Sequence, residues 1–239
     1  MIPENIIMLL FYGDPHTHFE KLLRAYKASE NLVSSVFLAG DQCPESPLEE
    51  LLESIICPVR FILGNHDADR EHWLENHFGM WNCHLHCCTH TVNGLAVAGL
   101  SGVFREKIWH PAGQDSPRYN TRQELKNYQK MRKKEGFHGW LPRKHWASIF
   151  PENFNVLSGL ETDILFTHEA PSVHKYGFSE IDELAELMGA QLIIHGHHHE
   201  RYSAVTCSGI KVIGLDKQDC FFVEKNSDGI KTHFFNFNL

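Results

Sequence analysis

Short apolar runs recur along this chain, and most of them end at a polar or glycine-containing turn. Five runs are rich in β-branched and aliphatic residues, which is typical of strands buried on both faces of a sheet. They lie at residues 6–12, 36–39, 59–63, 163–166 and 192–194. The pattern therefore predicts five core strands.

Segments with apolar residues at helical spacing alternate with these strands. They cover residues 19–30, 47–56 and 179–188. Serine is a favoured helix cap, and Ser46 and Ser179 stand where the second and third of these helices would begin. Amphipathic helices that alternate with buried strands predict an α/β fold in which the helices cover a sheet.

Strand patterns of a different kind follow in two places. From Cys83 the chain alternates polar and apolar residues up to an Asn93-Gly94 turn, and 95–100 follows as the second strand of a hairpin. After Glu200, four short strand-like segments follow closely at 202–206, 210–215, 221–223 and 231–237. We expect these four to form a second, largely antiparallel sheet that closes the chain.

Length and composition are those of a globular enzyme. With 239 residues, 42% of them hydrophobic, the chain can bury a large core as one domain over residues 1–239. No run approaches the roughly 18 apolar residues of a membrane span, and the first twelve residues lack the features of a signal peptide. Seven cysteines without regular spacing fit a reducing compartment. We therefore expect a cytoplasmic protein with no membrane partner.

Charge is distributed unevenly. The whole chain carries a formal charge of −8, but residues 105–144 hold eleven Lys or Arg against four Asp or Glu. Aromatic residues and turn-forming Gly and Pro are mixed with these cations, which indicates an irregular insert at about 104–155 with one helix near 122–134. Two interpretations stay open, a solvated structural loop and a cap whose cations meet an anionic substrate.

Five polar clusters stand in order along the chain, and four of them directly follow a predicted strand. In open α/β sheets ligands bind beyond the carboxyl ends of the strands, so these side chains are expected to converge. A mixed set of Asp, Asn and His suits borderline divalent ions. The clusters are Asp14-Pro15-His16, Gly40-Asp41, Gly64-Asn65-His66-Asp67, Thr167-His168 and Gly196-His197-His198-His199.

This ordered set resembles the motifs of the calcineurin-like metallophosphoesterases over residues 14–199, and the run 167–172 with His174 is similar to bacterial members. The resemblance implies a four-layer α/β/β/α sandwich with two mixed β-sheets. It also implies a dinuclear site at the strand carboxyl ends for two divalent ions, chosen among Mn, Fe, Zn, Co and Ni. Carried over by position, Asp14, His16, Asp41 and His199 would hold one ion, and Asp41, Asn65, His168 and His197 the other.

The same resemblance implies a role for each group in the reaction. A carboxylate shared by two ions keeps them roughly 3.5–4 Å apart, and a water between them becomes the attacking hydroxide. His66 would protonate the leaving group, and Asp67 would orient His66. Where the family usually has glycine after the His16 position, this chain has Thr17. Position alone makes four further residues candidates for substrate contact: His18, Arg105, His174 and His198.

We therefore expect a metal-dependent phosphoester hydrolase that acts on a phosphomonoester or phosphodiester, with a slight preference for a nucleotide-type phosphodiester. Its partners would be phosphorylated small molecules or nucleotides, with nucleic acid as a further partner through the basic insert. Two alternatives stay open, a Ser/Thr phosphoprotein phosphatase and a non-catalytic metal-binding scaffold of the same fold.

One further segment, residues 83–90, is rich in cysteine and histidine. Zinc fingers carry paired cysteines two residues apart, and this segment lacks that spacing. We therefore expect ordinary strand residues here rather than a zinc site.

Overall fold

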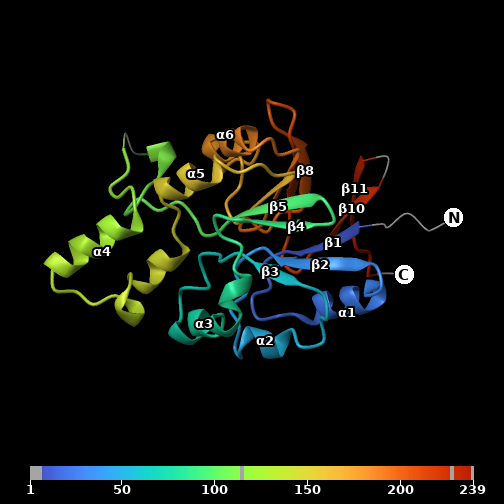
Figure 1. Cartoon of the computed structure of the whole chain (residues 1–239), viewed down its shortest axis with the longest axis horizontal. Coiled ribbons are helices and arrows are strands. Elements are labelled where there is room, and N and C mark those ends of the chain that lie inside the picture. The colour runs from blue at the N-terminus through green and yellow to red at the C-terminus, as the bar shows by residue number, and fades with distance from the viewer. Residues whose placement is uncertain (1–6, 114–115, 227–228, 238–239) are drawn as a thin grey trace.

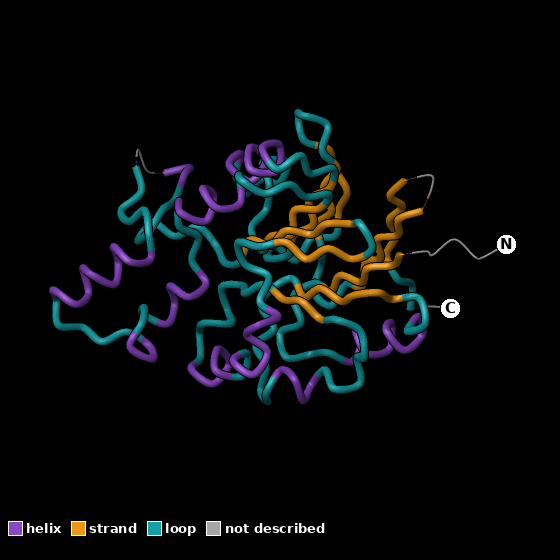
Figure 2. The backbone as a smooth tube through the Cα atoms, in the orientation of Figure 1, coloured by secondary structure: helices purple, strands orange, loops and turns teal. Residues whose placement is uncertain are grey.

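The computed structural model describes residues 7–113, 116–226 and 229–237. Within these ranges the strands form two mixed sheets that pack face to face (Figures 1 and 2). The five-stranded sheet has the order β11-β10-β1-β2-β3, and the six-stranded sheet has the order β4-β5-β6-β7-β9-β8. The strands are β1 Ile7–Tyr12, β2 Val33–Leu38, β3 Val59–Phe61, β4 Thr89–Val92, β5 Leu95–Leu100, β6 Ile164–Thr167, β7 Leu192–His195, β8 Tyr202–Val205, β9 Lys211–Gly214, β10 Cys220–Asn226 and β11 Gly229–Phe234.

Helices cover the outer faces of both sheets. In Figure 1, α1, α2 and α3 lie below the five-stranded sheet, and α5 and α6 lie above the six-stranded one. The α-helices are α1 Glu20–Ser29, α2 Leu48–Leu51, α3 Glu71–Glu75, α4 Arg122–Met131, α5 Pro151–Leu157 and α6 Ser179–Leu187. Short 3₁₀ helices span Phe78–Cys83, Pro111–Gly113, Phe137–Gly139 and Arg143–Ala147. The expected α/β/β/α layering is confirmed.

The alternation of side chains along β1 shows how the layers are held together. Leu9 and Phe11 point into the core between the two sheets, whereas Leu10 and Tyr12 point into the core beneath the helices. Phe11 meets Phe166 of the other sheet edge to face, with ring centroids 5.2 Å apart. Both faces of β1 are buried, as its nearly continuous apolar sequence predicts.

All five expected core strands are present, and Ile6, the expected first residue of the first one, lies outside the described residues. β1, β2 and β3 run parallel in one sheet, and β5, β6, β7 and β9 run parallel in the other. The carboxyl ends of parallel neighbours meet at one edge of a sheet, so this topology positions the polar clusters that follow the strands.

The last four strands differ from expectation, because they do not form a sheet of their own. β8 and β9 extend the six-stranded sheet, where β9 pairs parallel with β7, while β10 and β11 extend the five-stranded sheet beside β1. An alternating pattern shows that a segment is a strand but does not determine its partner, which depends on burial of its faces. The β4–β5 hairpin is confirmed, with both Asn93 and Gly94 at positive φ, as a type I′ turn requires.

Two of the expected helices start or end differently. α2 is shorter than the expected 47–56, because the chain turns toward β3 and the Ile56 amide donates to the Tyr26 hydroxyl instead of continuing the helix. The N-cap residues are Pro47 and Phe178, so neither Ser46 nor Ser179 is a cap. No helix in the described part of the chain is long and apolar enough to cross a membrane.

The basic segment 104–155 extends away from the sheets on the left of Figure 1 and contains α4. α4 lies within the expected helix, and its cap Thr121 accepts a hydrogen bond from the Glu124 amide at 3.1 Å. Four buried residues form a small core of its own: Ile108, Leu125, Leu141 and Phe150. Arg143 joins the segment to the loop after β3, since its guanidinium donates to the carbonyls of Ala68 and Asp69.

Candidate metal centre

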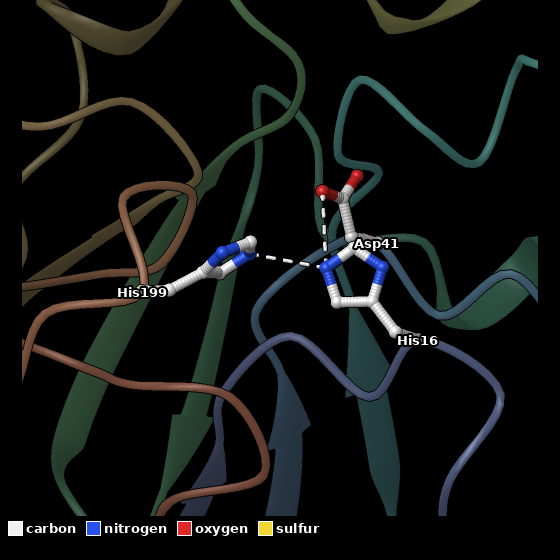
Figure 3. A group of neighbouring side chains, drawn as sticks. All are labelled: His16, Asp41 and His199. Atoms are coloured by element: carbon white, nitrogen blue, oxygen red, sulfur yellow. Dashed lines mark hydrogen bonds and ion pairs between the residues drawn. The ribbon is translucent and has the colours of Figure 1, made fainter.

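The polar residues that follow the strands converge between the carboxyl ends of the two sheets. In the first group, the Nε2 atoms of His16 and His199 are 3.0 Å apart, and His16 Nε2 is 3.9 Å from Asp41 Oδ2 (Figure 3). Asp14 belongs to the same group, because its Oδ2 lies 3.4 Å from His199 Nε2. These four side chains follow β1, β2 and β7, so residues far apart in sequence meet here.

A second group shares Asp41 with the first. His168 Nε2 is 3.5 Å from Asp41 Oδ2 and 3.2 Å from Asn65 Oδ1. The imidazole of His197 lies beside that of His168, with ring centroids 4.9 Å apart. Donor atoms of Asp41, His168 and His197 are all close enough to one another to share one ion. Asp41 therefore contributes to both sets of donor atoms, whereas Asp14 approaches His168 only at Nδ1, at 3.7 Å, the nitrogen that also contacts the Ala39 carbonyl.

The two carboxylates are buried in a way that suits cations. Asp14 and Asp41 are almost completely buried, and Asp14 Oδ1 and Asp41 Oδ2 have no hydrogen-bond partner. A buried carboxylate oxygen without a partner is costly, and a nearby divalent cation would offset that cost. The donor set thus fits one or two divalent ions.

Ionisation in the cluster supports the same interpretation. Burial lowers the pKa of His197 to about 2 and that of His199 to about 4, so both imidazoles are neutral and keep a lone pair for a metal. Burial has the opposite effect on Asp14, whose pKa it raises to about 8. Burial also opposes charge on His168, but Asp41 and Asp14 more than offset it and raise the pKa of His168 to about 10. A cation bound there would displace that proton.

Backbone contacts fix the orientation of the ligating groups. The Ala39 carbonyl lies 2.7 Å from His168 Nδ1, so that nitrogen donates and Nε2 is directed at Asn65 and Asp41. The amide of His197 donates to Asp14 Oδ2 at 2.7 Å, and the amide of His66 donates to Asp41 Oδ1 at 2.7 Å.

Strained backbone is concentrated at this site. His16, Asp41, His197 and His199 all have φ between 43° and 73°, a region that residues with a Cβ seldom adopt. Thr17, which replaces the usual glycine, has φ 73° and is β-branched, so it is strained further. Such strain persists only where the surrounding structure imposes it, and it is characteristic of functional sites.

The glycines of the motifs allow the backbone to lie close to the carboxylates of the site. A Cβ on Gly64 would collide with Asp41 Oδ1, and a Cβ on Gly196 would collide with Asp14 Oδ1. Both positions therefore exclude larger residues, which explains why glycine precedes Asn65 and His197 in the sequence.

His66 lies next to the cluster rather than in it. Its ring is 5.6 Å from that of His16 between centroids, and its side chain is 46% exposed. The carboxylate that contacts its ring is Asp69, with Oδ2 2.7 Å from His66 Nδ1. Asp67 was expected in that place but is buried, and it accepts hydrogen bonds from the Cys43 and Gly64 amides. Asp67 therefore holds the loops together, and Asp69 orients His66.

The four candidates for substrate contact lie in different surroundings. Burial lowers the pKa of Arg105, and the nearby carboxylates of Asp69, Glu169 and Asp41 partly offset that effect. His174 and His198 stack on each other with centroids 4.0 Å apart, and His198 is adjacent to the His197 ring. His18 is exposed, and its carbonyl accepts a hydrogen bond from the Tyr12 hydroxyl.

Sequence reasoning missed Glu169. This buried carboxylate has Oε1 3.4 Å from His197 Nε2, and its Oε2 accepts a hydrogen bond from the Phe104 amide. Burial raises the pKa of Glu169 to about 7. Its place directly after His168 was the only signal in the sequence, and it does not distinguish Glu169 from an ordinary loop residue.

The segment 83–90 contributes to none of the groups of donor atoms close enough to share an ion within the described ranges. Nε2 of His84 forms a hydrogen bond with the Ser101 hydroxyl at 2.7 Å, and Nε2 of His86 lies 3.0 Å from a guanidinium nitrogen of Arg122. His84 forms an isolated β-bridge with Phe61, residues 86–88 form a bend and β4 begins at Thr89, so most of this segment is not the continuous strand we expected.

Comparison with known proteins identifies the family. Residues 7–201 match the family model described as calcineurin-like phosphoesterase, which is most of the chain. The chain belongs to this family. Membership confirms the expected class of enzyme, a phosphoester hydrolase, and the family typically binds divalent metals.

Individual relatives match over most of the chain. An uncharacterized protein of Haemophilus influenzae is 35% identical over 211 residues, which cover 87% of this chain and 90% of that protein. Among solved structures, TT1561 of Thermus thermophilus has a TM-score of 0.57 at 15% identity and covers 95% of this chain and 98% of its own. GAP50 of Plasmodium, described as the anchor in the inner membrane complex, has a TM-score of 0.54 at 12% identity, with 96% and 84% covered. The fold of these two solved structures thus extends over nearly the whole chain.

Proposed function

We propose that this calcineurin-like phosphoesterase hydrolyses its ester at a dinuclear centre held by the seven side chains of the two groups. Asp14, His16, Asp41 and His199 would hold one ion, and Asp41, Asn65, His168 and His197 would hold the other. The observation that carries the proposal is the position of Asp41, whose carboxylate belongs to both groups.

The chain's own residues divide the remaining tasks. When bound, two divalent ions supply hydroxide at neutral pH and positive charge for the phosphoryl oxygens. Asp41 holds the two groups together, and the backbone bonds described above keep Asp14 and His168 in place. His66, supported at Nδ1 by Asp69, presents its other ring nitrogen to the leaving group and donates a proton to it.

Hydrolysis of p-nitrophenyl phosphate and bis(p-nitrophenyl) phosphate tests this proposal. Protein stripped of metal by a chelator is expected to be inactive, and addition of Mn, Fe, Zn, Co or Ni should restore turnover with at least one ion, since availability and geometry rather than ligand type select among them. Metal content is measured in parallel by mass spectrometry. Intact folded protein that turns over neither ester with any of these ions would contradict the proposal.

Replacing Glu169 with glutamine should weaken metal binding by about 10- to 100-fold, because partners that orient a ligating histidine typically contribute that much. The glutamine can still accept the Phe104 amide, so the fold should be retained. Calorimetric titration with Mn or Zn measures the effect. Glu161→Gln is the matched control, because Glu161 is exposed and lies before β6. Unchanged metal affinity in Glu169→Gln would show that Glu169 does not orient His197 for metal binding.

For the substrate we propose a nucleotide-type phosphodiester ahead of a phosphoprotein. The support is the basic, aromatic segment, which contacts Asp69 and Glu169 beside the centre through Lys144 and Phe104 and suits phosphate and base contacts. The convergence of the expected ligands favours hydrolysis over an anchoring role of the kind named for GAP50. We also propose a cytoplasmic location, supported by the seven cysteines, all of which are free.

A further inference from the structure

Two adjoining cavities in the basic segment lie beside the metal centre. The first has a volume of about 420 Å³ and is lined by Phe104, Arg105, Glu106, Lys107, His110, Lys144 and His145. A separate, larger cavity of about 570 Å³ lies elsewhere, near the start of β6, and its lining includes Glu161, Asp163 and Glu186. That acidic cavity is unsuited to a phosphorylated substrate, whereas the cavity beside Arg105 is basic.

Charge in the first cavity is predominantly positive. Arg105, Lys107 and Lys144 contribute three cations, and Glu106 is the acid in the lining. His145 adds no charge, because burial, with help from Arg105 and Lys107, lowers its pKa to about 4. A cavity of this kind attracts an anion.

Arg105 contributes a buried hydrogen-bond donor to this cavity. Its Nε is buried and has no hydrogen-bond partner. A buried donor of this kind is costly unless an acceptor reaches it. Phosphate is a suitable acceptor, because the guanidinium forms charge-assisted, often bidentate bonds with it.

Contacts on two sides connect the cavity with the centre. Phe104 donates its amide to Glu169 at 3.3 Å, and Glu169 is the carboxylate beside His197. Lys144 Nζ lies 3.8 Å from Asp69 Oδ1, and the other oxygen of Asp69 contacts His66. An anion in the cavity would therefore lie on the same side of the centre as His66.

The second cavity continues the first and adds aromatic surface. It has a volume of about 310 Å³ and shares Lys107 and His145 with its neighbour. Its lining includes Tyr119 and Tyr128, whose ring centroids are 5.8 Å apart, and Tyr128 is 40% exposed. An exposed tyrosine ring provides a face on which a nucleobase stacks.

We propose that the two cavities bind the leaving group of a nucleotide substrate that carries a second phosphate in addition to the one being hydrolysed. Arg105, Lys107 and Lys144 hold the second phosphate, and Tyr128 stacks on the base. The inference rests on the proposed function, since it assigns the leaving-group side from His66. It narrows the substrate class to nucleotides with two phosphate groups.

Competition against hydrolysis of a chromogenic ester tests the second phosphate. Adenosine 3′,5′-bisphosphate should inhibit the Mn-loaded protein at least about tenfold more tightly than adenosine 5′-monophosphate, the factor expected of one charge-assisted bond. In Arg105→Gln and in Lys144→Gln the ratio of the two inhibition constants should fall toward 1. Lys144 is 65% exposed, so its variant keeps the fold. Lys130→Gln, an exposed cation of α4 outside both cavities, should keep the native ratio.

The base contact has its own test. Tyr128→Ala should weaken inhibition by adenosine 3′,5′-bisphosphate and leave inhibition by fructose 1,6-bisphosphate, which has no aromatic ring, unchanged. Equal inhibition by mono- and bisphosphate in the native protein, or a ratio unaltered in both cation variants, would overturn the proposal. Absence of any turnover would instead refute the proposed function, and calorimetric binding of the same two nucleotides would then decide on the cavities.

Discussion

Replacing Asp41 with asparagine is expected to abolish phosphoester hydrolysis and to release metal from the protein. Asp41 is a member of both candidate ligand groups, and its Oδ2 is buried with no hydrogen-bond partner. Asparagine keeps the shape of the side chain but removes the negative charge that two cations would share. The loss in metal affinity should exceed the roughly 10- to 100-fold effect of outer partners, because on the proposed assignment Asp41 would contact the ions directly.

Metal content by mass spectrometry and turnover of p-nitrophenyl phosphate measure this effect. Asp163→Asn is a suitable control, because Asp163 precedes β6 at the opposite end from His168 and accepts the Ala96 amide. Thermal unfolding of both variants separates loss of metal from loss of fold. An Asp41→Asn protein that retains two ions and the native rate would show that this carboxylate is not the bridge.

His66→Ala should keep its metal and lose about 10²- to 10⁴-fold in rate on an ester with an alkyl leaving group. The imidazole lies outside the ligand groups, so metal content should not change. The loss should be much smaller with p-nitrophenyl phosphate, because p-nitrophenolate departs without protonation. Dependence on the leaving group therefore distinguishes a proton donor from a residue that merely shapes the site.

Comparison of the two esters in the native protein, His66→Ala and Asp69→Asn provides the measurement. Asp69→Asn should cause a smaller loss with the same dependence on leaving group, since Asp69 acts through the His66 ring. His72→Ala is the matched control, because His72 is a nearby exposed histidine that pairs with Glu45. If His66→Ala hydrolyses the alkyl ester as fast as the native protein does, His66 has no part in the reaction.

Local sequence predicted the parts of the site that each strand carries. Asp14, Asn65 and His168 stand just beyond runs whose apolar character marks them as buried strands, and parallel strands bring their carboxyl ends together. The structure places these residues at one point, as the pattern predicted. The roles assigned to them remain proposals that the experiments above test.

Features that depend on contacts between distant segments could not be predicted from the sequence. Asp67 and Asp69 are both acids close to His66, and only the turn that follows Asn65 determines that Asp69 faces the ring. Glu169 gains its position because Phe104, 65 residues earlier, donates an amide to it. The same holds for the last strands, whose pattern identified them as strands while the burial of their faces decided their sheet.

The pairing of β1 with β10 has a consequence for biosynthesis. Ile7 pairs with Lys225, so the strand that leads to Asp14 acquires one of its two neighbours only after β10 has left the ribosome. Until then one edge of β1 stays open and prone to association with other chains. Pairings of such long sequence separation also slow folding. Nascent chains that stall before residue 220 should therefore depend on chaperones.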